Sequence, residues 1–103
     1  MAIHISTHDQ DGRLIVSVEG DLNNTATKQA VESFAPIFQR TDCDIVIDCA
    51  GLNYISSSGL RLMLDVYKHA SANNHNVFLS HLSDEIMEIF DISGFLQLFK
   101  TEK

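Results

Sequence analysis

The sequence predicts an α/β fold in which about three helices pack on a mixed, mostly parallel sheet of four to five strands. Three observations lead to this prediction. The chain opens with two alternating apolar stretches around an Asp-Gly turn, which is typical of a β-hairpin. A short, uniformly apolar run follows at 44–49, as in a central strand. Helical patterns then alternate with strand-like stretches, and this order requires right-handed crossovers between parallel strands.

The first part of the chain is expected to form the hairpin and one helix. The alternating residues of the hairpin are Ile3, Ile5, Thr7, Leu14, Val16 and Val18. The polar cluster at 23–25 offers side chains that can cap a helix. After it, Val31, Phe34, Ala35 and Phe38 recur at helical spacing and predict the buried face. Pro36 lies near the end of this helix, so we expect a kink or an early stop there.

The second part is expected to alternate between strands and helices. A strand at 44–49 is followed by a loop at 50–55 and by a helix that ends near Asn73 and Asn74. Its predicted buried stripe is Leu60, Met63, Leu64 and Tyr67. The flanking Leu62 and Val66 either form an exposed apolar contact or, as we expect, widen the buried stripe. A strand at 76–80 precedes a short helix capped by Ser83, with Ile86, Ile89 and Phe90 inside. The apolar residues at 95–99 are either a strand or a docked tail.

Composition limits the kinds of partner. The formal net charge of −7 argues against nucleic acid and anionic membranes, because both require clustered Lys and Arg. There is no apolar run of the length of a membrane span and no signal-like start, so we expect a single domain over 1–103 in the cytoplasm. Cys43 and Cys49, about 20 Å apart along one strand, are expected to be buried, reduced thiols.

No motif for an enzyme or a cofactor is present. The sequence has no phosphate-binding loop, no dinucleotide fingerprint, no HExxH and no CxxC. Its five histidines do not share the i, i+4 spacing of ligands on one helix, so we expect no metal. We therefore predict a binding module that uses no cofactor and is not an enzyme.

Three consecutive serines mark the start of the second helix. Ser56, Ser57 and Ser58 precede Gly59 and the apolar stripe. Capping alone would account for serines here, but a glycine in the first turn costs helix stability and would let a large group approach the backbone. The carboxyl ends of parallel strands share one edge of a sheet, where sites of α/β proteins are found. The loop at 21–25 and the segment 56–59 should therefore be neighbours.

Three segments resemble one family. Residues 48–60, DCAGLNYISSSGL, are similar to the signature D-L-S-x-V-x-x-[IM]-D-S-[ST]-G-L of STAS domains of the bacterial anti-sigma factor antagonist type. Residues 20–26, GDLNNTA, resemble the family's G-[ED]-L-D-x-x-[TS]-A loop. Residues 89–95, IFDISGF, resemble its closing L-F-x-x-[ST]-G-[LF]. The three matches keep the family's order and span nearly the whole chain, which implies a single STAS-like domain.

The resemblance also implies a mechanism. Ser57 corresponds to the serine that a cognate kinase, itself an anti-sigma factor, phosphorylates in this family. The unphosphorylated protein binds that kinase and frees the sigma factor, the phosphorylated protein lets go, and a serine phosphatase resets the switch. The residues expected to contact the partner around Ser57 are Asp21, Asn23, Asn24, Thr25, Ser56, Ser58, Gly59 and Arg61.

The chain departs from the family pattern at the predicted contact. Ser56 and Asn23 stand where the family usually has Asp, and Arg61 stands where many relatives have a small residue. Such changes in charge alter which partner is recognised. The alternative is a STAS module of another assembly, such as a lipid-transport complex or a stress-signalling scaffold, without a phosphorylation switch. A small enzyme or nucleotide-binding protein that uses the same edge is a third, weaker alternative.

Overall fold

The structure is a computed structural model and describes residues 2–102. Its elements are β1 (His4–Gln10), β2 (Arg13–Leu22), α1 (Asn24–Phe38), β3 (Ile45–Asp48), β4 (Leu52–Ile55), α2 (Ser57–Ala72), β5 (Val77–Ser80), α3 (Asp84–Ile92), the 3-10 turn η1 (Phe95–Gln97) and β6 (Lys100–Glu102). The strands form one six-stranded sheet in the order β1-β2-β3-β5-β6, and β4 pairs with β2. Among the described strands β1 alone is antiparallel to its neighbour, so the predicted fold class is confirmed, with one strand more than expected.

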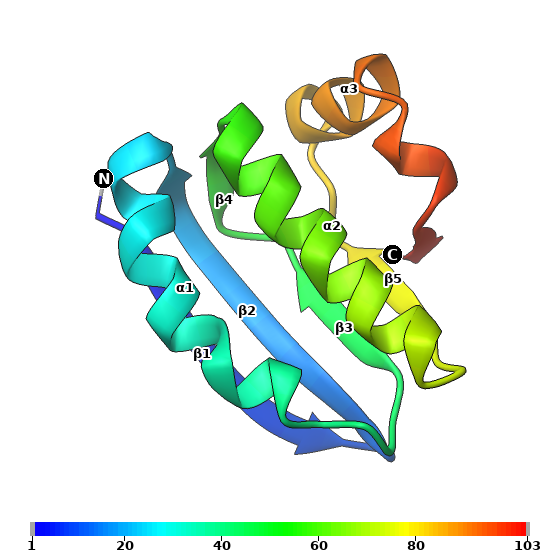
Figure 1. The fold of residues 1–103 in the computed structure, drawn as a ribbon. Coiled ribbons are helices and arrows are strands. Elements are labelled where there is room, and N and C mark those ends of the chain that lie inside the picture. Colours follow the sequence, from blue (N-terminus) through cyan, green and yellow to red (C-terminus); the bar gives the residue numbers. More distant parts are fainter. Residues whose placement is uncertain (1, 103) are drawn as a thin grey trace.

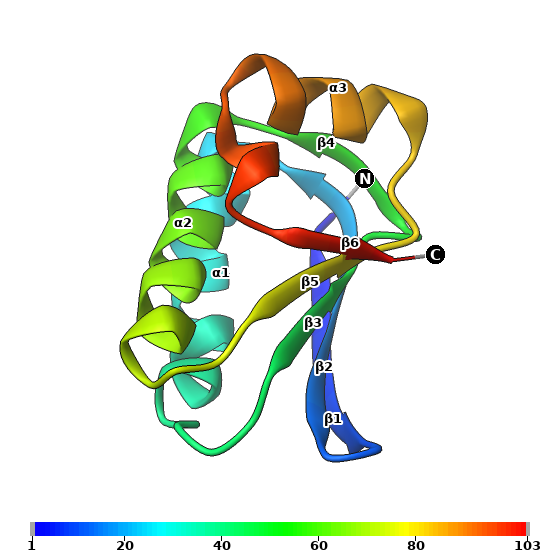
Figure 2. The same ribbon diagram turned by 90° about the vertical axis from the view of Figure 1, so that its right-hand side faces the viewer.

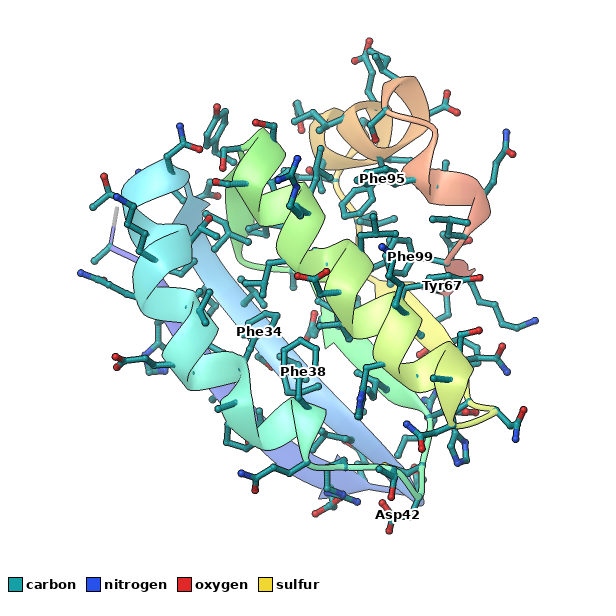
Figure 3. All side chains as sticks on the ribbon, viewed as in Figure 1. Phe34, Phe38, Asp42, Tyr67, Phe95 and Phe99 are labelled. Carbon is teal, nitrogen blue, oxygen red and sulfur yellow. The ribbon has the colours of Figure 1, made fainter. Side chains whose placement is uncertain are left out.

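The helices cover one face of this sheet. α1 and α2 lie side by side on that face, and α3 lies across the end of the sheet near β4 (Figures 1 and 2). Phe34 and Phe38 project from α1 toward α2 (Figure 3). The large, fully buried side chains of the core come from both layers and include Phe34, Phe90, Leu22, Ile37, Ile45, Ile47, Met63, Leu79 and Ile86.

Helix α1 begins where the sequence predicted but buries a different stripe. The Asn23 side chain caps it by accepting a hydrogen bond from the Ala26 backbone N–H at 2.8 Å. The buried residues are Ala26, Thr27, Ala30, Phe34 and Ile37. Val31 is 52% exposed and Ala35 is also exposed, so that part of the prediction was wrong. The buried stripe is rotated around the helix axis by about one residue from the predicted one. Pro36 lies in the last turn and the helix ends two residues later, in line with an early stop.

Residues 52–55 form a strand where the sequence predicted a loop. β4 runs parallel to the end of β2, with Gly20 opposite Leu52 and Leu22 opposite Ile55. Its first and last residues, Leu52 and Ile55, are buried, and Asn53 and Tyr54 between them are exposed. This segment lacks the alternation of apolar and polar residues that indicates a strand, so the local sequence did not predict β4. The pairing brings the start of α2 to the end of β2.

The rest of the chain follows the prediction more closely. α2 ends at Ala72, and Asn74 adopts a left-handed backbone. Leu60, Leu62, Met63 and Val66 are buried, whereas Leu64 and Tyr67 of the predicted stripe are only half-buried. Ser83 caps α3. The last apolar segment becomes a 3-10 turn followed by β6. Within it, Phe99 is buried and packs edge-on against Tyr67 and Phe90, with 5.7 Å between ring centroids in each pair (Figure 3 labels Phe99 and Tyr67).

The second face of the sheet carries no helix (Figure 2). The Arg13 side chain crosses it from β2 to β6, where its Nη1 donates to Glu102 Oε2 at 3.2 Å. On the way its guanidinium lies 5.3 Å from the centroid of the Phe78 ring on β5. Val46, on β3 between these strands, is only 3% exposed although its neighbours in β3 point to the helices. Arg13 thus shields apolar surface that no helix covers.

Two histidine–aspartate pairs join the ends of β3 to the ends of β5. His75 Nδ1 lies 3.1 Å from Asp44 Oδ1, and His81 Nδ1 lies 3.0 Å from Asp48 Oδ1. The Asn76 backbone N–H, which donates to Asp44, and to a lesser degree His75 hold the pKa of the Asp44 carboxyl below its usual range. These contacts connect β3 and β5, the central pair of parallel strands, at both ends.

Both cysteines are free and buried, as expected from the sequence. They flank β3, with Cys43 before it and Cys49 directly after it. Burial raises the pKa of the Cys49 thiol to about 12, and it also raises that of Cys43. The two side chains are therefore neutral, apolar parts of the core.

Candidate partner-binding site

The starts of α1 and α2 meet at one end of the molecule (Figure 1). The Ser58 hydroxyl donates to Asn24 Oδ1 at 2.7 Å, and the Ser56 backbone N–H donates to the Leu22 carbonyl at 2.9 Å. The prediction that the 21–25 loop and the 56–59 segment are neighbours is thereby confirmed. β4 is the element that makes this contact, because it lies beside the end of β2 and leads directly into α2.

The three serines have different environments. Ser56 is 7% exposed, and its Oγ caps α2 by accepting a hydrogen bond from the Gly59 backbone N–H at 3.2 Å. Ser58 is half-buried, with its Oγ 3.0 Å from that of Ser56. Ser57 is the first residue of α2 and is exposed. Within residues 2–102, its hydroxyl has no hydrogen-bond partner. Ser57 therefore carries the one free hydroxyl of the three.

Gly59 has a packing role that the sequence did not predict. A Cβ at this position would lie 2.9 Å from Cγ1 of Ile55 and 3.0 Å from Cγ of Leu22, both of which are buried. Gly59 itself is buried. The glycine therefore lets the first turn of α2 approach β2 and β4, and the expectation that it opens the backbone to a partner was wrong. Ser56 likewise faces inward as a cap.

The other predicted contact residues differ in exposure. Asn23, Asn24 and Thr25 are exposed at the start of α1, and Arg61 is exposed one turn into α2. Asp21 is half-buried on β2, where it lies opposite Tyr54 of β4. These positions lie on β2, α1 and α2, whose ends meet at the start of α2, and the exposed ones are polar side chains that a partner could reach.

Tyr54 is a candidate contact residue that the sequence reasoning missed. It is 48% exposed on β4, just before the serines. A large aromatic side chain left in contact with water beside a functional segment is typical of protein interfaces. The signal available in the sequence was a tyrosine in a predicted loop next to the serines. We call the exposed set Asn23, Asn24, Thr25, Tyr54, Ser57 and Arg61 the contact edge.

The contact edge is polar, and the one predicted contact residue with a carboxylate, Asp21, is half-buried on β2 and is not part of it. Arg61 is its only side chain with a formal charge, and the two positions where the family usually has Asp are Asn23 and Ser56. The helix N-termini below it present free N–H groups and the positive end of each helix dipole. An unmodified edge of this kind suits a partner surface that is polar and close to neutral.

Other features of the structure lie away from this edge. A hollow of about 420 Å³ is lined by His81, Leu82, Met87, Thr101 and Glu102, none of them a predicted site residue. Over residues 2–102, no group of three or more His, Cys, Asp or Glu side chains is arranged to hold a metal ion. In the same range, no helix has the length and apolar character needed to cross a membrane.

Comparison with known proteins gives the class of this fold and site. The model of the STAS domain family matches residues 4–103. BtrV of Bordetella bronchiseptica, assigned as an anti-sigma factor antagonist, is 35% identical over 89 residues, which cover 86% of this chain and 77% of BtrV. The anti-sigma-B factor antagonist of Staphylococcus epidermidis is 29% identical over 98 residues, 95% of this chain and 91% of that protein.

A solved structure agrees with the fold. SpoIIAA, a cell fate determinant of Bacillus, superposes in its phosphorylated form with a TM-score of 0.70 at 17% identity, over 99% of this chain and 92% of that one. The chain belongs to the STAS domain family and, within it, to the anti-sigma factor antagonists. The resemblance noted from the three sequence segments is confirmed.

Proposed function

We propose that this protein binds an anti-sigma factor with serine kinase activity through the contact edge, and that phosphorylation of Ser57 ends the binding. In the unmodified form the complex withholds the anti-sigma factor from its sigma factor. A serine phosphatase restores the unmodified protein. The protein acts by binding and not by catalysis, and the proposal includes a cytoplasmic location, because the kinase would use ATP.

The free hydroxyl of Ser57 is the observation that supports the proposal most directly. It is exposed and unbonded, whereas Ser56 and Ser58 hold structural hydrogen bonds. In the proposed reaction Ser57 Oγ forms a bond to the γ-phosphorus of ATP, and the bond from that phosphorus to the β,γ-bridging oxygen breaks. The hydroxyl proton passes to a base of the kinase, and ADP leaves.

A phosphoryl group at Ser57 would disturb binding without disturbing the fold. It adds about −1.5 to −2 elementary charges at the first residue of a helix, where free N–H groups and the dipole stabilise an anion. The bulk and charge point outward, because Ser57 is exposed. A partner shaped for a neutral hydroxyl would have to bury this charge, and that cost opposes association.

Partner capture from native lysate tests the proposal. We expect wild type and Ser57→Ala to retain the same anti-sigma factor and Ser57→Asp to lose it. Ser33→Asp, at an exposed serine on α1, is the matched control and should bind like wild type. Equal capture by all four proteins would contradict the switch. Circular dichroism of each variant separates loss of binding from loss of structure.

Intact mass spectrometry identifies the phosphoacceptor. After incubation with ATP and the captured kinase, we expect the mass of one phosphoryl group on wild type and none on Ser57→Ala. Modification of Ser57→Ala at Ser56 or Ser58 would show that the acceptor was chosen wrongly. Capture of a membrane or scaffold assembly, with no phosphorylation, would favour a STAS module of another kind.

A further inference from the structure

We propose that Arg61 clamps the phosphoryl group of phosphorylated Ser57 within α2. This inference rests on the proposed phosphorylation of Ser57 and concerns the modified side chain itself. It assigns Arg61 a positioning role in the phosphorylated state, in addition to its place on the contact edge.

The spacing of the two residues places them on one face of the helix. Ser57 and Arg61 are four residues apart in α2, and side chains at i and i+4 have Cβ atoms about 5–6 Å apart. Both residues are exposed, while Leu60 and Leu62 beside Arg61 are buried. Helical side chains lean toward the N-terminus, so a side chain as long as that of Arg61 can reach the turn that contains Ser57.

Arg61 is available for such a contact. The chain has three arginines. Arg13 is paired with Glu102, and Arg40 is paired with Asp9 and Asp42. In the part of the chain that the structure describes, Arg61 has neither an ion pair nor a hydrogen bond through its side chain. Its planar guanidinium can bind two phosphate oxygens at once.

The order of the charges along the helix favours the clamp. An anion four residues before a cation is the better orientation of an i, i+4 pair, and Ser57 precedes Arg61. Asp65 follows Arg61 by four residues, which is the weaker orientation. A dianionic phosphate also attracts the guanidinium more strongly than a single carboxylate does.

Other charged groups near Ser57 come from three neighbouring elements. Lys28 is exposed on α1, one turn after Asn24, and Asp21 is half-buried on β2. Helix α3, which packs against β4, carries the acids Asp84, Glu85, Glu88 and Asp91. The acids oppose the phosphate, and Lys28 belongs to a different helix. Arg61 is therefore the cation whose position in the sequence fixes it beside the modified residue.

The clamp has a consequence for the partner. Arg61 is the only charged side chain of the contact edge, so a partner that pairs with it loses that group when the phosphoryl group occupies it. Phosphorylation would then change two elements of the contact edge at once, the Ser57 hydroxyl and the Arg61 guanidinium. This explains how one modification can release a partner from a broad polar surface.

Phosphorus NMR on the full chain tests the clamp. Phosphoserine is incorporated at position 57 during synthesis, so that no cognate kinase is needed, and the second pKa of the phosphoryl group is read from its chemical shift against pH. We expect this pKa to be higher in Arg61→Gln than in wild type by roughly 0.3 pH units, because a nearby cation favours the dianion. Arg61→Lys should lie between the two.

Lys68→Gln is the matched control, because it removes the same charge from a position on α2 that lies about 16 Å from Ser57 along the helix axis. Its phosphoryl pKa should stay close to that of wild type, and the Arg61 Nε–Hε signal should shift on phosphorylation in both proteins. Equal phosphoryl pKa values in wild type, Arg61→Gln and Lys68→Gln would overturn the clamp. Unchanged partner binding by the phosphoserine protein would instead overturn the proposed function, and the NMR titration would still decide on the clamp.

Discussion

Replacing Gly59 with alanine is a direct test of how α2 is seated on the sheet. In an exposed helix position, alanine is more stable than glycine by about 1 kcal/mol. At Gly59 the structure predicts the opposite sign. The new methyl group would lie 2.9 Å from Ile55 Cγ1, 3.0 Å from Leu22 Cγ and 3.1 Å from Leu22 Cδ2.

The magnitude follows from these contacts. Carbon atoms pack best at about 3.5–4.0 Å, so Leu22 and Ile55 must move, and the two nearest contact atoms, Ile55 Cγ1 and Leu22 Cγ, are not the free ends of their side chains. Both residues are buried at 0% and 3% exposure, where overpacking costs about 1–3 kcal/mol. After the gain in helix propensity is subtracted, we expect a net loss of about 1 kcal/mol, or roughly 6 °C in Tm for a domain of this size.

Thermal and urea unfolding measure the effect. The comparison of Lys68→Gly with Lys68→Ala provides the reference, because Lys68 is exposed on the same helix and reports helix propensity without a packing cost. Alanine should stabilise the protein at position 68 and destabilise it at position 59. If Gly59→Ala raised the Tm as alanine does at position 68, the argument that glycine is required for packing would be wrong.

Three further predictions concern the cap, the thiols and the pH dependence. Ser56→Ala should cost about 1 kcal/mol in urea unfolding through loss of the α2 cap, with the far-UV spectrum unchanged. Cys49, whose pKa is raised to about 12 by burial, should react with a thiol reagent at about pH 8 only as fast as the protein opens, and rapid labelling of the native state would contradict its burial. The folded pKa of Asp44 is depressed, so its contribution to stability is present above the pKa of an unfolded aspartate, about 4, and is lost as the pH falls through the folded value. Asp44→Asn should therefore be less stable than wild type at neutral pH, with a gap in the free energy of unfolding that narrows as the pH falls below about 4, and a gap that did not change with pH would refute the assignment.

Local signals explain what the sequence predicted correctly. The hairpin turn, the caps Asn23, Ser56 and Ser83, and the burial of Leu60 and Met63 in α2 each depend on residues close together in the chain. The proximity of the 21–25 loop to the serines followed from the general geometry of parallel strands. The position of Ser57 at a helix start was predictable for the same reasons.

Long-range packing explains what the sequence did not predict. β4 forms only because β2 extends far enough to pair with it, and its own four residues show no alternation. In α1, two adjacent apolar stripes fit the helical period, and contact with the sheet selected the one through Phe34 and Ile37. The packing of Gly59 against Leu22 and Ile55 and the exposure of Tyr54 likewise depend on tertiary contacts. A single sequence does not encode such contacts locally.

The position of Phe99 has a consequence for the synthesis of this protein. Its ring completes an aromatic cluster with Tyr67 and Phe90, and β6, which follows it, is joined to β2 through Arg13 and Glu102. Phe99 and β6 thus complete a core whose other residues are synthesised earlier. We expect the nascent chain to acquire its full resistance to protease only once Phe99 and β6 have left the ribosome, and fragments that stop before Phe99 to be degraded. A cell would then accumulate no truncated form of this domain.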